Sequence, residues 1–158
     1  MNIDAIVEIP MNSNIKYEYD KDLNMIRYNR TLKLPMVYPC NYGFIPNTLG
    51  GDGDPLDILI LSENIFYPGI IINCKIIGVL LMEDEEGIDE KLIGIPNIDI
   101  NNNQNMNDLN DISEILLKKI KYFFTNYKNY DKDKWSKVYN YENKEKAIQI
   151  IHKYKNKL

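Results

Sequence analysis

Short apolar segments separated by turn residues occupy positions 1 to about 95, and this pattern is typical of β-strands. The first predicted strand covers residues 5–9 and ends at a proline. Residues 15–19 alternate between two faces with a period of two, as in a strand that is buried on one side. Residues 25–28 follow after a turn-like segment, so these two segments are predicted to pair as a hairpin.

The next segment, residues 35–46, carries three prolines together with Gly43 and is therefore interpreted as an irregular loop. After this loop, further apolar runs predict four more strands, at residues 57–62, 70–75, 76–82 and 91–95. The acidic run between the last two is predicted to close a hairpin.

Two apolar stripes with helical spacing follow in the last third of the chain. The pair Asp111 and Glu114 predicts the start of one helix, and a second helix is predicted to begin near Asn143. Residues 97–110 contain seven asparagines and are interpreted as a solvated loop. Strands first and helices afterwards predict an α+β fold in a single domain of residues 1–158, a small closed β-barrel with two main helices packed outside.

Length and charge limit the possible functions. With 158 residues, a net charge of −4 and an isoelectric point near 5.1, the chain lacks the basic face of a general nucleic-acid binder. Its longest apolar run, residues 76–82, is too short to span a bilayer. The N-terminal residues lack the basic region of a signal peptide, so a cytoplasmic protein without a membrane partner is expected.

Few residues are available for zinc binding or for a catalytic triad. His152 is the only histidine, which excludes histidine-based zinc sites and Ser-His or Cys-His triads. Cys40 and Cys74 fit no CxxC pattern and are expected to be free and partly buried. The chain has 17 lysines and only 2 arginines, so Arg30 is a candidate for a planar clamp on an anion, with a chance surface arginine as the alternative.

The most informative segment is an acidic one. Asp52, Asp54 and Asp57 place three carboxylates within six residues, and such groups repel one another unless cations neutralise them. Mg²⁺ prefers oxygen ligands of this kind. Pro55 keeps Asp54 out of the helical region, and the apolar run after Asp57 holds that residue at the start of a strand. The segment is interpreted as a divalent-metal site, or alternatively as a solvated acidic turn.

Two better-known motifs are excluded by spacing. An EF-hand loop that opened at Asp52 would need an oxygen ligand and then glycine at its fifth and sixth positions, where Leu56 and Asp57 stand. Neither GxxxxGK[ST] nor GxGxxG occurs, so the chain has no glycine loop of the phosphate-cradling type.

Other acidic, cationic and phenolic residues are spread along the chain, and each has a simple structural explanation when taken alone. Lys16 and Glu18 form a same-face strand pair, residues 83–86 form a solvated hairpin tip, Tyr127 belongs to a core stripe, and Lys128 is a helix-end charge. The remaining candidates are Glu8, Tyr38, Tyr42, Asp84, Glu85, Asp89, Lys91 and Lys134.

The order of these residues is more specific than any one of them. The ordered set is Glu8-Ile9-Pro10, Lys16-Tyr17-Glu18, Arg30, Tyr38-Pro39-Cys40-Asn41-Tyr42-Gly43, Asp52-Gly53-Asp54-Pro55-Leu56-Asp57, Asp84, Asp89, Lys91, Tyr127-Lys128 and Lys134-Trp135. This order resembles that of the family I soluble inorganic pyrophosphatases of the bacterial short form. The resemblance extends from about residue 5 to 154, and its most specific part is the DxDPxD motif after YPxNYG.

The resemblance implies a five-stranded OB-like closed β-barrel with two main helices, and an inorganic diphosphatase that hydrolyses pyrophosphate to two phosphates with Mg²⁺ as cofactor. The nucleophile would be a metal-bridged hydroxide. A cytoplasmic homo-oligomer, a hexamer in the family, is also implied. The chain departs from the family in its short N-terminal segment and in a helix 111–130 without histidine, and both weaken the inference of a hexamer.

The same resemblance assigns roles by matching position. Asp52, Asp57 and Asp89 would bind the tight metal pair, with Asp57 bridging, and Asp84 and Glu8 would help to hold metals that arrive with substrate. Asp54 would be the general base. The substrate-binding residues would be Lys16, Arg30, Tyr42, Lys91, Tyr127 and Lys128. No roles are assigned to the matching cavity positions Glu18, Tyr38, Glu85 and Lys134.

Two other functions compete with pyrophosphate hydrolysis. One is an OB-like module that binds a metal or an anionic ligand without turnover, although every expected site residue is present. The other is a metal-dependent phosphohydrolase acting on nucleotides, for which the sequence offers no base-recognition element.

Overall fold

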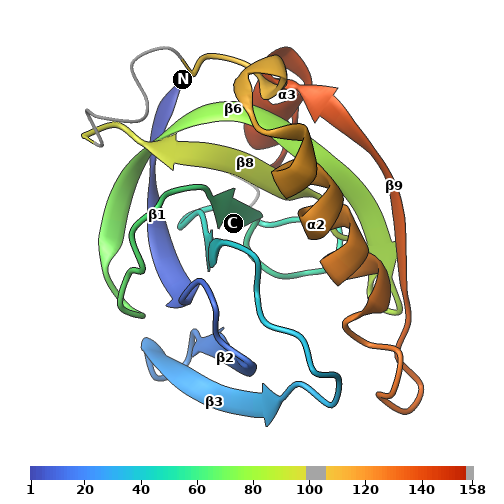
Figure 1. The fold of residues 1–158 in the computed structure, drawn as a ribbon. Helices are drawn as coiled ribbons and strands as arrows, with labels where there is room; N and C mark the ends of the chain where they lie inside the picture. The colour runs from blue at the N-terminus through green and yellow to red at the C-terminus, as the bar shows by residue number, and fades with distance from the viewer. Residues whose placement is uncertain (99–105, 156–158) are drawn as a thin grey trace.

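The computed structural model describes residues 1–98 and 106–155. Within them the chain forms one large sheet, a separate two-stranded hairpin and two α-helices (Figure 1). The strands are β1 (Asn2–Ile9), β2 (Ile15–Asp20), β3 (Met25–Thr31), β4 (Asn41–Phe44), β5 (Asp57–Ile60), β6 (Ile71–Asp84), β7 (Gly87–Ile88), β8 (Lys91–Pro96) and β9 (Ser136–Asn143). The helices are the short 3₁₀ helix η1 (Leu109–Asp111), α2 (Glu114–Asn126) and α3 (Lys144–Tyr154).

The large sheet has the strand order β1-β4-β5-β8-β6-β7, and β9 pairs with β6 outside this path. Among the strand pairs of the described residues only β5–β8 is parallel, and it places Asp57 directly opposite Lys91. The N-terminal part of β1 also pairs with β6, while its C-terminal part pairs with β4. The sheet is thus mixed, as an α+β fold allows, and β2 and β3 form the predicted hairpin beside it.

Two predicted features of the strands are wrong. The segments 70–75 and 76–82 are one continuous strand, β6, whose register shifts between Ile76 and Gly78 where it pairs with β8. The presumed loop 35–46 contains β4, which pairs with β1 and β5 on its two sides. Gly43 allows β4 to pack closely against β1, because a Cβ at its position would lie 2.1 Å from the carbonyl oxygen of Ile6.

The helices are largely as predicted, apart from one boundary. Asn143 caps α3 by accepting a hydrogen bond at Oδ1 from the backbone amide of Lys146. The N-cap of α2 is Ser113, and Asp111 instead closes a capping box with Asp108 around η1. The sequence prediction of a cap at Asp111 was therefore wrong by two residues. The central part of the predicted asparagine-rich loop, residues 99–105, lies outside the described residues.

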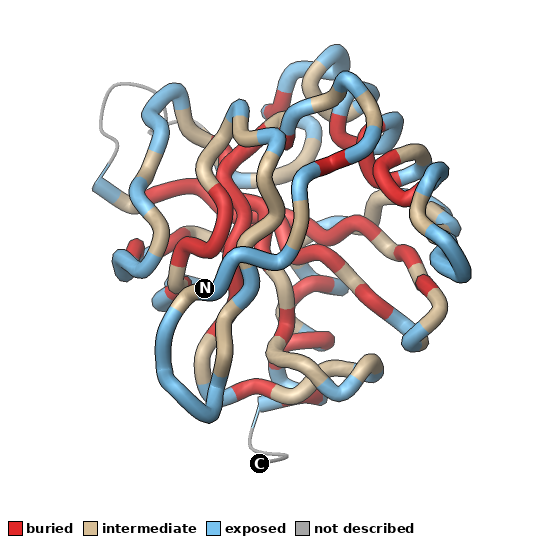
Figure 2. Tube along the Cα trace, turned by 90° about the horizontal axis from the view of Figure 1, so that it is seen from below, coloured by how far each residue is buried: buried red, intermediate tan, exposed pale blue. Residues whose placement is uncertain are grey.

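Two buried clusters hold these elements together, and β5 contributes to both because its successive side chains point to opposite faces. Leu59 packs in the cluster that contains Phe123 and Phe124 of α2. Ile58 and Ile60 pack in the cluster that contains the buried face of α3. Buried positions follow the central strands and one side of the helices, and exposed positions follow the turns (Figure 2).

Both cysteines are free, as predicted, and they are fully rather than partly buried. Burial raises the pKa of the Cys40 thiol to about 12, and burial followed by the nearby Asp4 charge raises the pKa of the Cys74 thiol to about 12. Their role is in packing. Among the described residues, no helix has the length and apolar character needed to cross a bilayer.

Candidate active site

A cavity of about 200 Å³ lies between the large sheet, the β2–β3 hairpin and the connection that follows α2. All twelve residues to which the sequence analysis gave a role line it: Glu8, Lys16, Arg30, Tyr42, Asp52, Asp54, Asp57, Asp84, Asp89, Lys91, Tyr127 and Lys128. The four positions without a role, Glu18, Tyr38, Glu85 and Lys134, line it too. Residues up to 126 positions apart in sequence therefore share one polar cavity.

Three carboxylates form the acidic centre of the cavity. One oxygen from each of Asp52, Asp57 and Asp89 lies within 4.8 Å of the others. The loop that carries Asp52 is held by a hydrogen bond from the Gly50 amide to the Asp54 carbonyl (2.7 Å) and by one from the Asp54 amide to Asp52 Oδ1 (3.0 Å). This spacing suits a hard divalent cation, which takes carboxylate oxygens as ligands.

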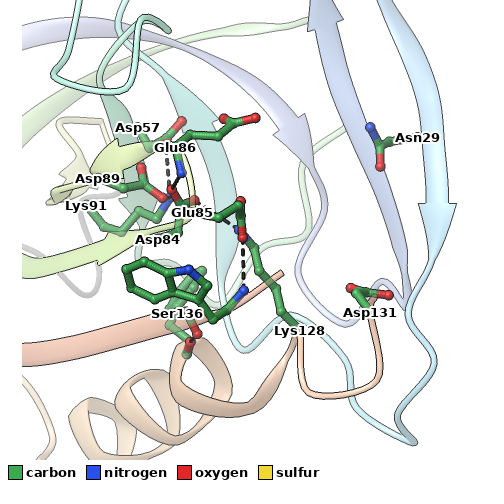
Figure 3. A network of polar contacts seen from close by, with 12 residues as sticks. Asn29, Asp57, Asp84, Glu85, Glu86, Asp89, Lys91, Lys128, Asp131 and Ser136 are labelled. Atoms are coloured by element: carbon green, nitrogen blue, oxygen red, sulfur yellow. Dashed lines mark hydrogen bonds and ion pairs between the residues drawn. The ribbon is translucent and has the colours of Figure 1, made fainter. Parts of the chain in front are cut away.

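Lys91 contacts this acidic centre, and its ammonium group is the main positive charge that balances the carboxylates. Its Nζ donates to Asp57 Oδ2 (2.7 Å), Asp89 Oδ2 (2.8 Å) and the hydroxyl of Tyr42 (2.7 Å), with the side chain 2% exposed (Figure 3). Burial alone would lower the pKa of Lys91, but the charges of Asp57 and Asp89 outweigh it and raise that pKa well above its usual value. Lys91 is therefore held as a cation.

One ammonium group does not neutralise so many buried carboxylates. Burial is the largest cause in each case, and it raises the pKa of Glu8 to about 8 and those of Asp52 and Asp89 to about 7. Neighbouring carboxylates contribute to these raised pKa values, and for Glu8 the neighbour is Asp57. A site in which several acids resist ionisation fits a bound cation, since a cation would favour their charged forms.

A second ion cluster lies farther along the cavity wall. Lys128 Nζ, from the connection after α2, donates to Asp84 Oδ2 (2.9 Å) at the end of β6 and to Glu85 Oε2 (3.0 Å) in the turn that follows (Figure 3). The backbone amide of Trp135 also donates to Glu85. Burial is the largest single effect on Asp84 and raises its pKa, but the hydrogen bonds from Lys128 and the Glu86 amide, together with the lysine charges, outweigh burial, and the net effect is a lowered pKa. Asp84 is thus an ionised carboxylate paired with a cation.

Asp54 differs from its neighbours in the acidic loop. It is half-buried, lines the cavity, and is not one of the three carboxylates that converge within 4.8 Å. Burial, followed by the charge of Glu18, raises its pKa. A carboxylate with a raised pKa that is outside the ligand cluster is suited to accept a proton.

The remaining cations and phenols surround the space above these acids. Burial is the largest effect on Lys16, whose pKa is lowered, and on Tyr127, whose pKa is raised well above its usual value. The Tyr127 ring stacks on Phe123, which fixes its orientation. These groups offer N–H and O–H donors to an anion in the cavity.

Comparison with known proteins decides the family. The family model described as inorganic pyrophosphatase matches residues 5–158. The chain belongs to the inorganic pyrophosphatase family. Among curated members, that of Rickettsia bellii is 49% identical over 94% of this chain and 86% of its own length. The solved inorganic pyrophosphatase of Helicobacter pylori superposes with a TM-score of 0.92 at 45% identity, covering 97% of this chain and 91% of that one. The Thermus thermophilus enzyme gives a TM-score of 0.92 at 39% identity, covering 96% and 87%.

Several residues of this pyrophosphatase cavity were not found by sequence reasoning. Lys21 and Asn29 line it and have no local signal in the sequence. Glu86 lines it too, although residues 83–86 are interpreted from sequence as a solvated hairpin tip. Tyr17 and Tyr19 also line it, although the alternation of β2 predicts that they point away from the face of Lys16 and Glu18. A register shift between Lys16 and Tyr17 lets consecutive residues of β2 reach the same space. No signal in a single sequence marks such an irregularity.

Proposed function

We propose that this chain hydrolyses inorganic pyrophosphate to two phosphates in this cavity, with Mg²⁺ as the divalent cation. The observation that carries the proposal is the convergence of Asp52, Asp57 and Asp89 within 4.8 Å in a member of the inorganic pyrophosphatase family. Metal dependence is a property of that family. Mg²⁺ is the specific choice because an all-carboxylate ligand set suits a hard cation that keeps part of its water shell.

Metal binding is assigned to two groups of acids. Asp52, Asp57 and Asp89 would hold the tight pair, with Asp57 shared, since Asp57 lies between the loop of Asp52 and the strand after Asp89. Asp84 and Glu8, at the cavity wall, would help to hold cations that enter with the substrate. When bound, such cations neutralise phosphate charge and lower the pKa of coordinated water.

Asp54 would accept the proton from the attacking water. Its position outside the ligand cluster leaves its oxygens available, and its raised pKa brings it nearer to the range in which a base is most effective. No covalent nucleophile is required, which agrees with the buried thiols and with the single, exposed histidine, His152.

Substrate binding is assigned to the cations and phenols around the acids: Lys16, Arg30, Tyr42, Lys91, Tyr127 and Lys128. Pyrophosphate carries several negative charges that repel a nucleophile, and fixed donors in a partly dry cavity offset them. Lys91 and Lys128 are already buried and paired with acids, so the cations on this wall are held in place before substrate arrives.

The proposal extends to the architecture of residues 1–158 as one catalytic domain. Strands β1, β4, β5, β8 and β6 would close a five-stranded OB-like barrel, since β1 pairs with both β4 and β6.

A cytoplasmic homo-oligomer, hexameric in form, would cover exposed apolar residues such as Ile115 and Tyr122 on α2. Light scattering coupled to size exclusion would give its mass, and a monomer at micromolar concentration would contradict this part.

One assay separates the proposed function from its two competitors. Phosphate release is measured with pyrophosphate, ATP and a phosphomonoester, each with Mg²⁺ and with EDTA. We expect rapid release from pyrophosphate in Mg²⁺, loss of that release in EDTA, and far slower release from the other two substrates. Preferred cleavage of ATP would favour a nucleotide phosphohydrolase, and no cleavage of any substrate would favour a binding module.

A further inference from the structure

Asp131, which does not line the cavity, forms an ion pair with Arg30, which does. Arg30 Nε lies 3.2 Å from Asp131 Oδ2, close enough for an ion pair although not aligned as a hydrogen bond. The Asp131 side chain is 8% exposed and that of Arg30 18%. Because a carboxylate this deeply buried needs a cation beside it, the pair fixes one edge of the guanidinium.

The rest of the guanidinium makes one further hydrogen bond to the part of the chain that the structure describes. Nη1 donates to Asn29 Oδ1 (2.9 Å), and Asn29 in turn donates to Glu18 (2.8 Å). Nη2 is buried and has no hydrogen-bond partner within residues 1–98 and 106–155. An unpaired buried N–H is costly, and this atom lacks a partner, which an anionic oxygen in the cavity beside Arg30 could supply.

Asp131 also joins two parts of the molecule that carry the phosphate donors. Arg30 and Lys16 belong to the β2–β3 hairpin, which is a sheet of its own. Asp131 belongs to the connection between α2 and β9, where its amide bonds the carbonyl of Lys128 (3.0 Å). Figure 3 shows Asp131 on this connection, opposite the hairpin strand that carries Asn29. A second, looser contact joins Lys33 Nζ to Asp131 Oδ1 at 3.7 Å.

We propose that Asp131 is a positioning residue for substrate binding: it orients Arg30 so that Nη2 faces a phosphate oxygen, and it sets the distance between the cations of the hairpin and Lys128. This inference rests on the proposed function, in which Arg30 binds the phosphate. Asp131 itself touches no substrate. Its effect should appear in substrate affinity, because a misaligned planar fork loses one of its two directed hydrogen bonds.

The test uses Asp131→Asn, Arg30→Lys and the double variant in the full chain. The matched control is Asp20→Asn, since Asp20 pairs with Arg27 (2.9 Å) on the same hairpin and neither of these residues lines the cavity. We expect Asp131→Asn to raise KM for pyrophosphate about tenfold with kcat changed less than about threefold, and Asp20→Asn to change neither by more than about twofold. In the Arg30→Lys background, Asp131→Asn should add less than about twofold.

Two kinetic results would overturn the proposal. One is an unchanged KM in Asp131→Asn, with or without a fall in kcat, since a fall in kcat alone indicates a merely structural role. The other is multiplied rather than shared effects in the double variant. Calorimetric titration with imidodiphosphate, which is not hydrolysed, gives the same test without turnover, and equal affinity of wild type and Asp131→Asn would overturn it. Failure of the proposed function is recognised separately, as absence of phosphate release by the wild-type chain.

Discussion

Asp57 and Lys91 face each other across the parallel pair of β5 and β8, and their side chains form a 2.7 Å ion pair beside the acidic centre of the cavity. Lys91 shares its ammonium group with Asp89 at 2.8 Å. Two of the three converging carboxylates therefore have a cation in the absence of metal. Asp52 contacts no lysine or arginine among the ion pairs of the described residues. Asp52 thus depends on a bound cation for neutralisation more than Asp57 and Asp89 do.

The first prediction concerns the stability of the metal-free protein. Glu8, Asp52 and Asp89 have pKa values raised from 4.5, 3.8 and 3.8 to about 8, 7 and 7. Consider a pH between the pKa of one of these acids in the unfolded chain and its higher pKa in the native protein. At such a pH the native state binds more protons than the unfolded state, so the free energy of unfolding falls as the pH rises. In EDTA we expect a melting temperature roughly 5 °C or more higher at pH 6 than at pH 8.5.

Calorimetry in EDTA at both pH values checks this expectation. The Asp52→Asn variant should show a smaller difference, because one of the three titrating acids is removed, and Mg²⁺ should abolish most of the difference in wild type. A metal-free protein that is equally stable at pH 6 and pH 8.5 would show that these acids are ionised without difficulty in the folded state.

The second prediction concerns Arg30. Arg30→Lys keeps the charge but replaces a planar group with several directed donors by a single ammonium group. We expect kcat/KM for pyrophosphate to fall about tenfold, mainly through KM, because the unpaired Nη2 is lost. Steady-state kinetics measure this, with Arg27→Lys on the exposed side of the same hairpin as the control. Wild-type kinetics in Arg30→Lys would reduce Arg30 to an ordinary surface charge.

The third prediction concerns Asp54 as the base. Asp54→Asn should lower kcat by roughly 10²–10⁴, the usual contribution of a positioned base. Tight metal binding should remain, because Asp54 lies outside the carboxylate cluster, and the acidic limb of the pH–rate profile should move. Calorimetric Mg²⁺ titrations of the Asp54→Asn and Asp52→Asn variants distinguish the role of a base from that of a metal ligand. Loss of metal binding in Asp54→Asn would make Asp54 a ligand, with Asp84 the next candidate for the base.

The candidate site could be predicted from sequence because its residues lie in short motifs of distinctive composition. Three carboxylates around Pro55 indicate cation chemistry on local grounds alone. Their convergence with Lys91 depends on the pairing of β5 with β8, which follows from two buried apolar strands. Asp131 was missed because its partner Arg30 is 101 positions away, and an aspartate among the lysines of this connection carries no local signal.

Strand prediction failed where burial did not follow the usual alternation. β4 is only four residues long, fully buried, and contains Gly43, whose missing side chain admits the backbone of β1. β9 (Ser136–Asn143) has a mostly polar sequence with a weak hydrophobic pattern, and it forms because it pairs with the edge of β6. In both cases pairing between distant segments outweighed local composition.

The central claim is that a cation held by Asp52, Asp57 and Asp89 supports pyrophosphate hydrolysis in this cavity, and Asp57 tests it most directly. Phosphate release from pyrophosphate is measured against Mg²⁺ concentration for wild type, Asp57→Asn and the control Glu63→Gln, whose residue is exposed and lies outside the cavity. We predict that Asp57→Asn lowers the rate at least about 10³-fold and weakens Mg²⁺ activation, while Glu63→Gln behaves as wild type. Near-normal turnover and Mg²⁺ dependence in Asp57→Asn would contradict the account.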